Sequence, residues 1–91
     1  MYFVYLLESI NFGKWYIGFT PDDVYKRLVK HNTGLVKSTK AFKPWKIIYY
    51  EAYFDRSDTT GREKFLKSGA GRAFMKKQLK NYIKMVHHVR T

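Results

Sequence analysis

Five side chains of this sequence could together hydrolyse a phosphodiester: Tyr5, Tyr16, Arg27, His31 and Glu63. That reaction needs a base to take a proton from water and cations to hold the non-bridging oxygens. It also needs a divalent cation to neutralise the phosphate and the departing oxygen. Tyrosine and histidine can transfer protons, arginine binds phosphate, and one or two carboxylates can hold Mg²⁺. Each residue alone also has an ordinary explanation, since tyrosines often fill a core and polar helix residues often face solvent.

Glu63 is the candidate metal ligand among the seven acidic residues. The other six fall at or near predicted helix starts or at strand ends, where a carboxylate has a structural use: Asp22, Asp23, Asp55, Asp58, Glu8 and Glu51. Glu63 lies instead in a basic helix, between Arg62 and Lys64. The alternative is an ion pair with Lys67, four residues later, worth only a few tenths of a kcal/mol.

A predicted strand at 14–20 organises the rest of the chain. Alternation divides its side chains between two faces, with Trp15, Ile17 and Phe19 toward a core and Tyr16, Gly18 and Thr20 on the other side. A glycine inside a strand often marks close approach by a ligand or another backbone. We therefore expect Gly18 to leave a shallow, uncovered spot on the sheet where a phosphate approaches.

A helix is predicted directly after this strand. Thr20 can cap it, and it should run to about His31. Val24 and Leu28 are four residues apart and should face the core. Arg27 and His31 have the same spacing and share a different face of the helix.

The remaining elements follow from apolar runs and turn residues: strands at 2–7 and 45–53, a hairpin turn at 11–13, a helix capped by Ser57 or Asp58, a break at 68–71, and a basic last helix at about 72–86. The run at 2–7 is apolar without interruption, which indicates a strand buried on both faces. The order strand, strand, helix, strand, helix, helix predicts one α+β domain over residues 1–91. Its sheet has three strands, antiparallel or mixed, and is flanked by helices.

The charge balance favours an anionic partner, with nucleic acid as the first candidate. The chain has 18 Lys and Arg against 7 Asp and Glu, a formal net charge of +11. Basic residues that could meet a DNA backbone are Lys37, Lys40, Lys43, Arg72, Lys76, Lys77, Lys80 and Lys84. The absence of cysteine excludes disulfides and fits a reducing cytoplasm. We expect no signal peptide and no membrane span, because no apolar run approaches about 18 residues.

Taken together, these residues resemble the GIY-YIG nuclease superfamily. The resemblance is to its small stand-alone members, which are related to the N-terminal nuclease module of the bacterial excision-repair incision enzyme. The two halves of the motif are Phe3-Val4-Tyr5, with Phe3 where the family name has glycine, and the intact Tyr16-Ile17-Gly18. Further matches are Arg27, the segment His31-Asn32-Thr33-Gly34, the strand 45–51, and Arg62-Glu63 with Leu66-Lys67-Ser68. The resemblance covers residues 2–77.

This resemblance implies a DNA endonuclease of repair or recombination that uses one Mg²⁺ or Mn²⁺ held by Glu63. Arg27 would bind the scissile phosphate, and Tyr5 and Tyr16 would line the site from adjacent strands. The family uses a tyrosine as its proposed general base, and Tyr5 is our first choice, with Tyr16 open. His31 could instead take the proton, directly or from the tyrosine, because it titrates near neutrality. The expected contacts to DNA are Lys14, Gly18, Asn32, Lys37, Lys40, Arg72 and Lys76.

Two other functions fit the composition. A nucleic-acid-binding module without turnover, accessory to repair or recombination, would have the same charge and would bind in a salt-sensitive way. A protein that binds a membrane surface or a partner through the basic C-terminal helix is the second alternative. Cleavage of DNA would separate the nuclease from both.

Overall fold

The sheet is built around β1 (Tyr2–Ser9), which pairs antiparallel with β2 (Trp15–Thr20) on one side and with β3 (Trp45–Tyr53) on the other. The last six residues of β1 are buried, as its uninterrupted apolar run predicts. The predicted α+β class, element order and three-stranded sheet are therefore confirmed, and both strand pairings are antiparallel.

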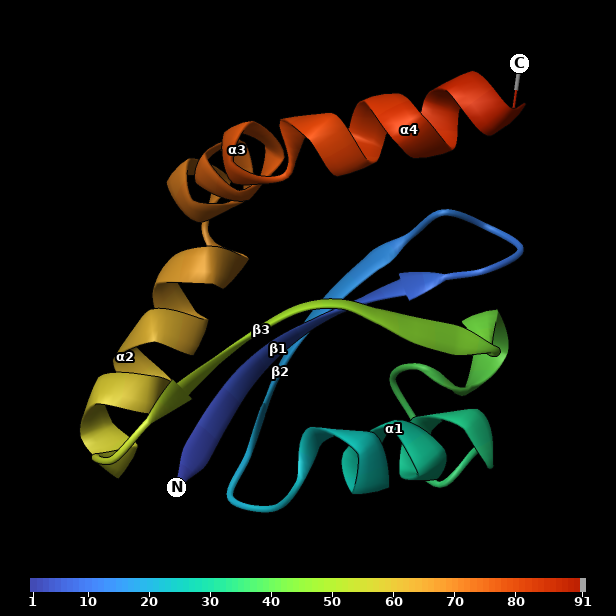
Figure 1. Cartoon of the computed structure of the whole chain (residues 1–91). Helices are drawn as coiled ribbons and strands as arrows, with labels where there is room; N and C mark the ends of the chain where they lie inside the picture. Colours follow the sequence, from blue (N-terminus) through green and yellow to red (C-terminus); the bar gives the residue numbers. More distant parts are fainter. Residues whose placement is uncertain (91) are drawn as a thin grey trace.

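The structure is a computed structural model that describes the backbone of residues 1–90 and the side chains of residues 1–86. Helices cover both faces of its sheet (Figure 1). Their bounds are α1 (Val24–Asn32), the 3₁₀ turn η1 (Lys40–Phe42), α2 (Arg56–Lys67), α3 (Gly69–Gln78) and α4 (Lys80–Arg90). In the described part of the chain, no helix has the length and apolar character needed to cross a membrane.

Each face of the sheet has its own core. On the side that we call the α1 face, Tyr5 and Leu7 of β1 pack with Val24 and Leu28 of α1 and with Trp45 of β3. The predicted inward position of Val24 and Leu28 is thus confirmed. The opposite side is the α3 face, where other side chains of β1 pack against α2 and α3: Val4 and Leu6 against Leu66 and Met75. Figure 1 shows α1 on one side of the sheet and α3 and α4 on the other.

The hairpin between β1 and β2 closes through Gly13, which adopts a φ of 68° that favours glycine. Its amide donates to the Ser9 carbonyl oxygen at 2.9 Å, and the Ser9 amide donates to the Lys14 carbonyl oxygen at 2.8 Å. The predicted hairpin turn is therefore present, and it sets the register in which Tyr5 lies opposite Gly18.

Helix starts differ from the predicted ones by a few residues. Asp23, not Thr20, caps α1, and its side chain accepts from the amides of Tyr25 and Lys26 at 2.8 and 3.1 Å. Thr20 remains the last residue of β2. Asp55, rather than Ser57 or Asp58, caps α2. In both cases an aspartate a few residues from the predicted cap accepts hydrogen bonds from the first helix amides, as an N-cap does.

The C-terminal region forms two helices where the sequence predicts one at about 72–86. Helix α2 ends at Lys67 as expected, but Ser68 then caps α3 by accepting from the Gly71 amide at 3.1 Å. A Cβ atom at Gly71 would overlap the carbonyl oxygen of Phe65. Gly71, part of the segment that the sequence marks as a helix break, thus lets α3 begin directly against the last turn of α2. A second break follows at Leu79, before α4.

Candidate active site

Tyr5 is the centre of the site, and its ring lies over Gly18 of the neighbouring strand. A Cβ atom at position 18 would overlap Cζ and Oη of Tyr5 and would lie 2.7 Å from its Cε2. Gly18 is buried, so the expectation of an uncovered spot there is wrong. The glycine provides room for the Tyr5 ring to cross β2, which is an approach by a side chain instead of by a ligand.

A chain of buried hydrogen bonds leads away from the Tyr5 hydroxyl. Tyr5 Oη lies 2.8 Å from His31 Nε2, and His31 Nδ1 lies 2.7 Å from Thr39 Oγ1. The Thr39 hydroxyl donates to the Val36 carbonyl oxygen at 3.3 Å, so its oxygen accepts from a proton on Nδ1. These partners assign the Nδ1–H tautomer to His31. Its Nε2 is then the acceptor for the Tyr5 hydroxyl.

The surroundings of His31 keep its ring neutral. Burial and then the nearby positive charge of Arg27 lower the pKa of His31 to about 4, because both disfavour the imidazolium form. The side chain has no exposed surface. At neutral pH, His31 therefore offers an unprotonated Nε2 toward Tyr5.

Arg27 is a second hydrogen-bond partner of the Tyr5 hydroxyl. Its Nε donates to Tyr5 Oη at 3.4 Å. Burial raises the pKa of Tyr5 above its usual value, and the hydrogen bond and charge of Arg27 offset this only in part. The charges of Tyr16 and Glu63 raise it further. Tyr5 is therefore protonated at neutral pH, and its hydroxyl donates a hydrogen bond to His31 Nε2.

Tyr16 joins the site through its ring. Its centroid lies 5.3 Å from that of His31, at an interplanar angle of 61°, and 6.3 Å from that of Trp45. The side chain is half-buried on the α1 face. Tyr16 thus helps to hold the His31 ring in place, while Tyr5 has the hydrogen bond that can transfer a proton.

Glu63 lies on α2. Its charge contributes to the raised pKa of Tyr5, so it acts on the Tyr5 hydroxyl electrostatically. Its Oε2 also forms the alternative ion pair that the sequence allows, at 3.0 Å from Lys67 Nζ. The two side chains are 22% and 50% exposed, so solvent reaches the carboxylate and the lysine is free to move away.

The donor set suits a hard cation. Among the described residues, no group of three or more His, Cys, Asp or Glu side chains could enclose a metal ion. Mg²⁺ does not need such a cage, since one or two carboxylates suffice when water and phosphate oxygens complete its shell. Glu63 supplies one solvent-accessible carboxylate, which fits Mg²⁺ or Mn²⁺.

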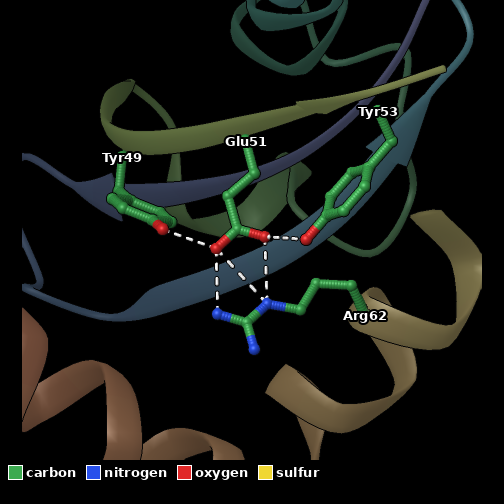
Figure 2. A network of polar contacts seen from close by, with 4 residues as sticks. All are labelled: Tyr49, Glu51, Tyr53 and Arg62. Atoms are coloured by element: carbon green, nitrogen blue, oxygen red, sulfur yellow. Dashed lines mark hydrogen bonds and ion pairs between the residues drawn. The ribbon is translucent and has the colours of Figure 1, made fainter. Parts of the chain in front are cut away.

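A second carboxylate fixes the helix that carries Glu63. Glu51 of β3 accepts from Arg62 Nε and Nη2, each at 2.9 Å, and from the hydroxyls of Tyr49 and Tyr53 at 2.5 and 2.6 Å (Figure 2). Burial raises the pKa of Glu51, but the hydrogen bonds from Arg62 and the two tyrosines outweigh it and leave the pKa below the usual value. This cluster ties α2 to β3 at the residue before Glu63.

Sequence reasoning missed two of these supports. The sequence places Glu51 at a strand end. Tyr49, Glu51 and Tyr53 nevertheless alternate along β3 and share one face, and this alternation is a signal that could identify the cluster. Nothing in the sequence around Thr39 indicates its contact with His31. It lies in a loop, and only the fold brings its hydroxyl to His31.

The predicted DNA contacts fall into separate groups. Lys14, Lys37 and Lys40 are exposed, and Lys14 Nζ lies 4.0 Å from the ring centroid of Phe42 on the α1 face. Arg72 and Lys76 are exposed on α3, across the sheet.

Asn32 has a structural use in this fold. Its side-chain Nδ2 donates to the Trp45 carbonyl oxygen at 3.0 Å, and its Oδ1 accepts from the Trp45 backbone amide at 2.6 Å. These bonds join the end of α1 to the start of β3. A substrate contact by Asn32 stays a prediction.

Comparison with known proteins gives one family and several relatives. The family model described as the GIY-YIG catalytic domain matches residues 1–79. A UPF0213 protein of Staphylococcus epidermidis is 37% identical over 68 residues, which are 74% of this chain and 80% of the relative. A UPF0213 protein of Listeria welshimeri is 37% identical over 67 residues, 72% of each chain. No solved structure matches the chain. The region matched by the family model contains Tyr5, Tyr16, Arg27, His31 and Glu63.

Proposed function

This chain belongs to the GIY-YIG catalytic-domain family, a nuclease family, and from this premise we propose that it is a divalent-metal-dependent endonuclease that hydrolyses DNA phosphodiester bonds. We infer that it acts in DNA repair or recombination in the cytoplasm. The observation that carries the proposal is the hydrogen-bonded chain from Tyr5 through His31 to Thr39, with Arg27 at the Tyr5 hydroxyl.

In the proposed reaction, Tyr5 and His31 act together as the base. Tyr5 Oη takes a proton from the attacking water while its own proton passes to His31 Nε2, so Tyr5 never exists as a free tyrosinate. This order suits a tyrosine whose pKa burial raises. The geometry favours Tyr5 over Tyr16, because Tyr5 has the proton acceptor within 2.8 Å.

The substrate itself would assist this transfer. His31 is a weak proton acceptor while its pKa is about 4, with burial and Arg27 as the causes. A phosphate bound at Arg27 would neutralise that positive charge and bring negative charge to the site, and both changes raise the pKa of a nearby histidine. Proton transfer is then easiest when DNA is in place.

Glu63 would hold the cation, and the cation would stabilise the negative charge that develops on the phosphate and the departing oxygen. Lys67 must leave the carboxylate for this to happen, which its half-exposed side chain allows. Arg62 does not compete with the cation, because its guanidinium pairs with Glu51 and successive helix side chains do not face each other.

The test is a nicking assay on supercoiled plasmid and on branched DNA, with Mg²⁺ or Mn²⁺. Glu63→Gln should abolish cleavage and retain DNA binding in EDTA, with an affinity equal to or slightly higher than wild type, because the change frees Lys67 for a phosphate. Asp58→Asn is the matched control, because it removes the same charge from an exposed position of the same helix and should cleave normally. Cleavage that survives Glu63→Gln would indicate a contaminating nuclease and remove the assignment. Salt-sensitive binding without cleavage on any DNA would leave a non-catalytic binding module.

A further inference from the structure

A large cavity lies on the α3 face, outside the hydrogen-bonded chain of Tyr5 and His31. It has a volume of about 750 Å³ and opens between the β1–β2 hairpin and helices α3 and α4. In Figure 1, α4 crosses above this hairpin. Its apolar walls come from Ile17 of β2, Leu66 of α2, Met75 of α3 and Ile83 of α4. The volume is in the range of sites that bind small organic molecules.

The interior of the cavity contains an aromatic ring and a hydrogen-bond acceptor. Trp15 lines it, and its Nε1 donates to Oε2 of Glu8 at 2.9 Å. Glu8 is 5% exposed, and its Oε1 accepts from the Tyr82 hydroxyl at 2.6 Å and lies 3.8 Å from Lys46 Nζ. An ionised carboxylate has about four acceptor positions. Glu8 can therefore still accept from an N–H donor of a ligand.

Positive charge lines the same cavity. Lys67, Arg72 and Lys76 contribute to its lining, and all three residues are exposed at the surface. Lys67 also pairs with Glu63, so the cavity adjoins the carboxylate of the candidate active site. The matching ligand has a flat apolar body, N–H donors at its edge and an attached anion. Those are the properties of a nucleotide.

We propose that this cavity binds one unpaired nucleobase of the DNA substrate, with the flanking phosphates at Lys67, Arg72 and Lys76. The inference rests on the proposed function, because it takes DNA as the substrate. Extrusion of a base is least costly where it is already unpaired, so the site selects bulges, mismatches and single-stranded junctions over intact duplex. A phosphate at the cavity mouth also attracts Lys67 away from Glu63, which frees that carboxylate when the correct DNA is bound.

The experiment measures binding in EDTA, where cleavage cannot interfere. Fluorescence anisotropy compares a duplex with one unpaired nucleotide to the fully paired duplex, and we expect a preference of about tenfold from stacking of the base. Lys76→Ala should weaken binding of the bulged duplex more than that of the paired one. Lys77→Ala is the matched control, since it removes the same exposed side chain from the adjacent position outside the cavity lining and should keep the preference.

Ile83→Trp provides an independent test, because the larger ring fills the cavity while its surface cations remain. It should remove the preference and leave the affinity for paired DNA unchanged. Val29→Trp, at an exposed position of α1, should keep the preference. Equal wild-type affinities, or a preference that Lys76→Ala and Lys77→Ala reduce equally, would overturn the inference. If Ile83→Trp does not fold, the lysine pair decides. If the protein cleaves DNA but does not prefer the bulged duplex, only the proposed base-binding site is excluded. If it prefers the bulged duplex but does not cleave DNA, only the proposed nuclease activity is excluded.

Discussion

The contact between Gly18 and Tyr5 allows a sharp test of the proposed site. Gly18→Ala would add a methyl group at the position where the Tyr5 ring lies, overlapping Cζ and Oη. Tyr5 is 2% exposed and belongs to the central strand, so the backbone has little freedom to shift. The ring must therefore turn, and its hydroxyl must leave His31 Nε2 and Arg27 Nε.

Two effects follow, and their sizes can be estimated. Overpacking a core costs about 1–3 kcal/mol in the free energy of unfolding. In a domain of this size, each kcal/mol lowers the Tm by about 4–8 °C, so we expect a fall of about 5–20 °C. Loss of a positioned general base costs about 100-fold or more in kcat. DNA affinity in EDTA should stay close to wild type, because the basic surface is untouched.

The assay combines thermal unfolding by circular dichroism with nicking kinetics well below the Tm of the variant. Gly61→Ala is the control: it lies on α2 with Glu63, and an added Cβ there meets nothing within 4 Å. It should raise stability by about 0.5–1 kcal/mol and retain full activity. A Gly18→Ala protein with wild-type Tm and wild-type kcat would refute the reasoning, because Tyr5 would then need neither the space nor its present position.

Three further predictions concern other parts of the molecule. His31 has a pKa of about 4 in the folded protein and 6.5 in the unfolded chain, so the unfolded chain takes up the proton first as the pH falls. The free energy of unfolding should therefore decrease by up to about 3 kcal/mol between pH 6.5 and pH 4. A free energy of unfolding that stays constant over that range would contradict this prediction. Arg62→Lys keeps the charge but loses the two-point contact with Glu51, so the free energy of unfolding measured in urea should fall by about 1–2 kcal/mol. An unchanged midpoint of unfolding would show that the contact does not stabilise the fold. Gly71→Ala should lower the Tm strongly through overlap with a backbone carbonyl of α2, whereas Gly69→Ala, with open space around it, should not; equal effects would count against the packing of α3.

The elements that the sequence predicts well are those whose pattern has one physical solution. An uninterrupted apolar run at 2–7 can be buried only if both faces are covered, which requires a central strand, and β1 is that strand. The spacing of Val24 and Leu28 allows a single inward face, and the structure has it. The resemblance to a nuclease family predicts that Tyr5 and His31 share a site, which the periodicity of the sequence does not indicate. In the structure, Tyr5 Oη lies 2.8 Å from His31 Nε2.

Other features depend on contacts between distant segments. Ser68-Gly69-Ala70-Gly71 has the composition of a break, yet α3 includes the glycines because Gly71 packs against the last turn of α2. The sequence predicts an open spot for a ligand at Gly18, because the residues on the same face of the strand, Tyr16 and Thr20, are polar. The occupant comes from β1 instead, and the sequence of β2 contains no sign of it. Local propensity cannot report which side chain crosses a strand to fill a gap.

The distribution of acids shows how so basic a chain could keep a carboxylate available for the proposed cation. With a net charge of +11, any exposed glutamate attracts cationic side chains. Arg62 directly precedes Glu63, but successive helix side chains do not face each other. Its guanidinium also has a partner in Glu51, through a two-point contact that the hydroxyls of Tyr49 and Tyr53 reinforce. Glu63 pairs with Lys67 in a single-point contact whose lysine is half exposed, and ion pairs at the protein surface contribute only about 0–1 kcal/mol. A DNA phosphate or a divalent cation can displace so weak a contact, whereas it could not displace a bidentate arginine. In the proposed reaction, Glu51 would therefore contribute indirectly, by binding the arginine that precedes Glu63.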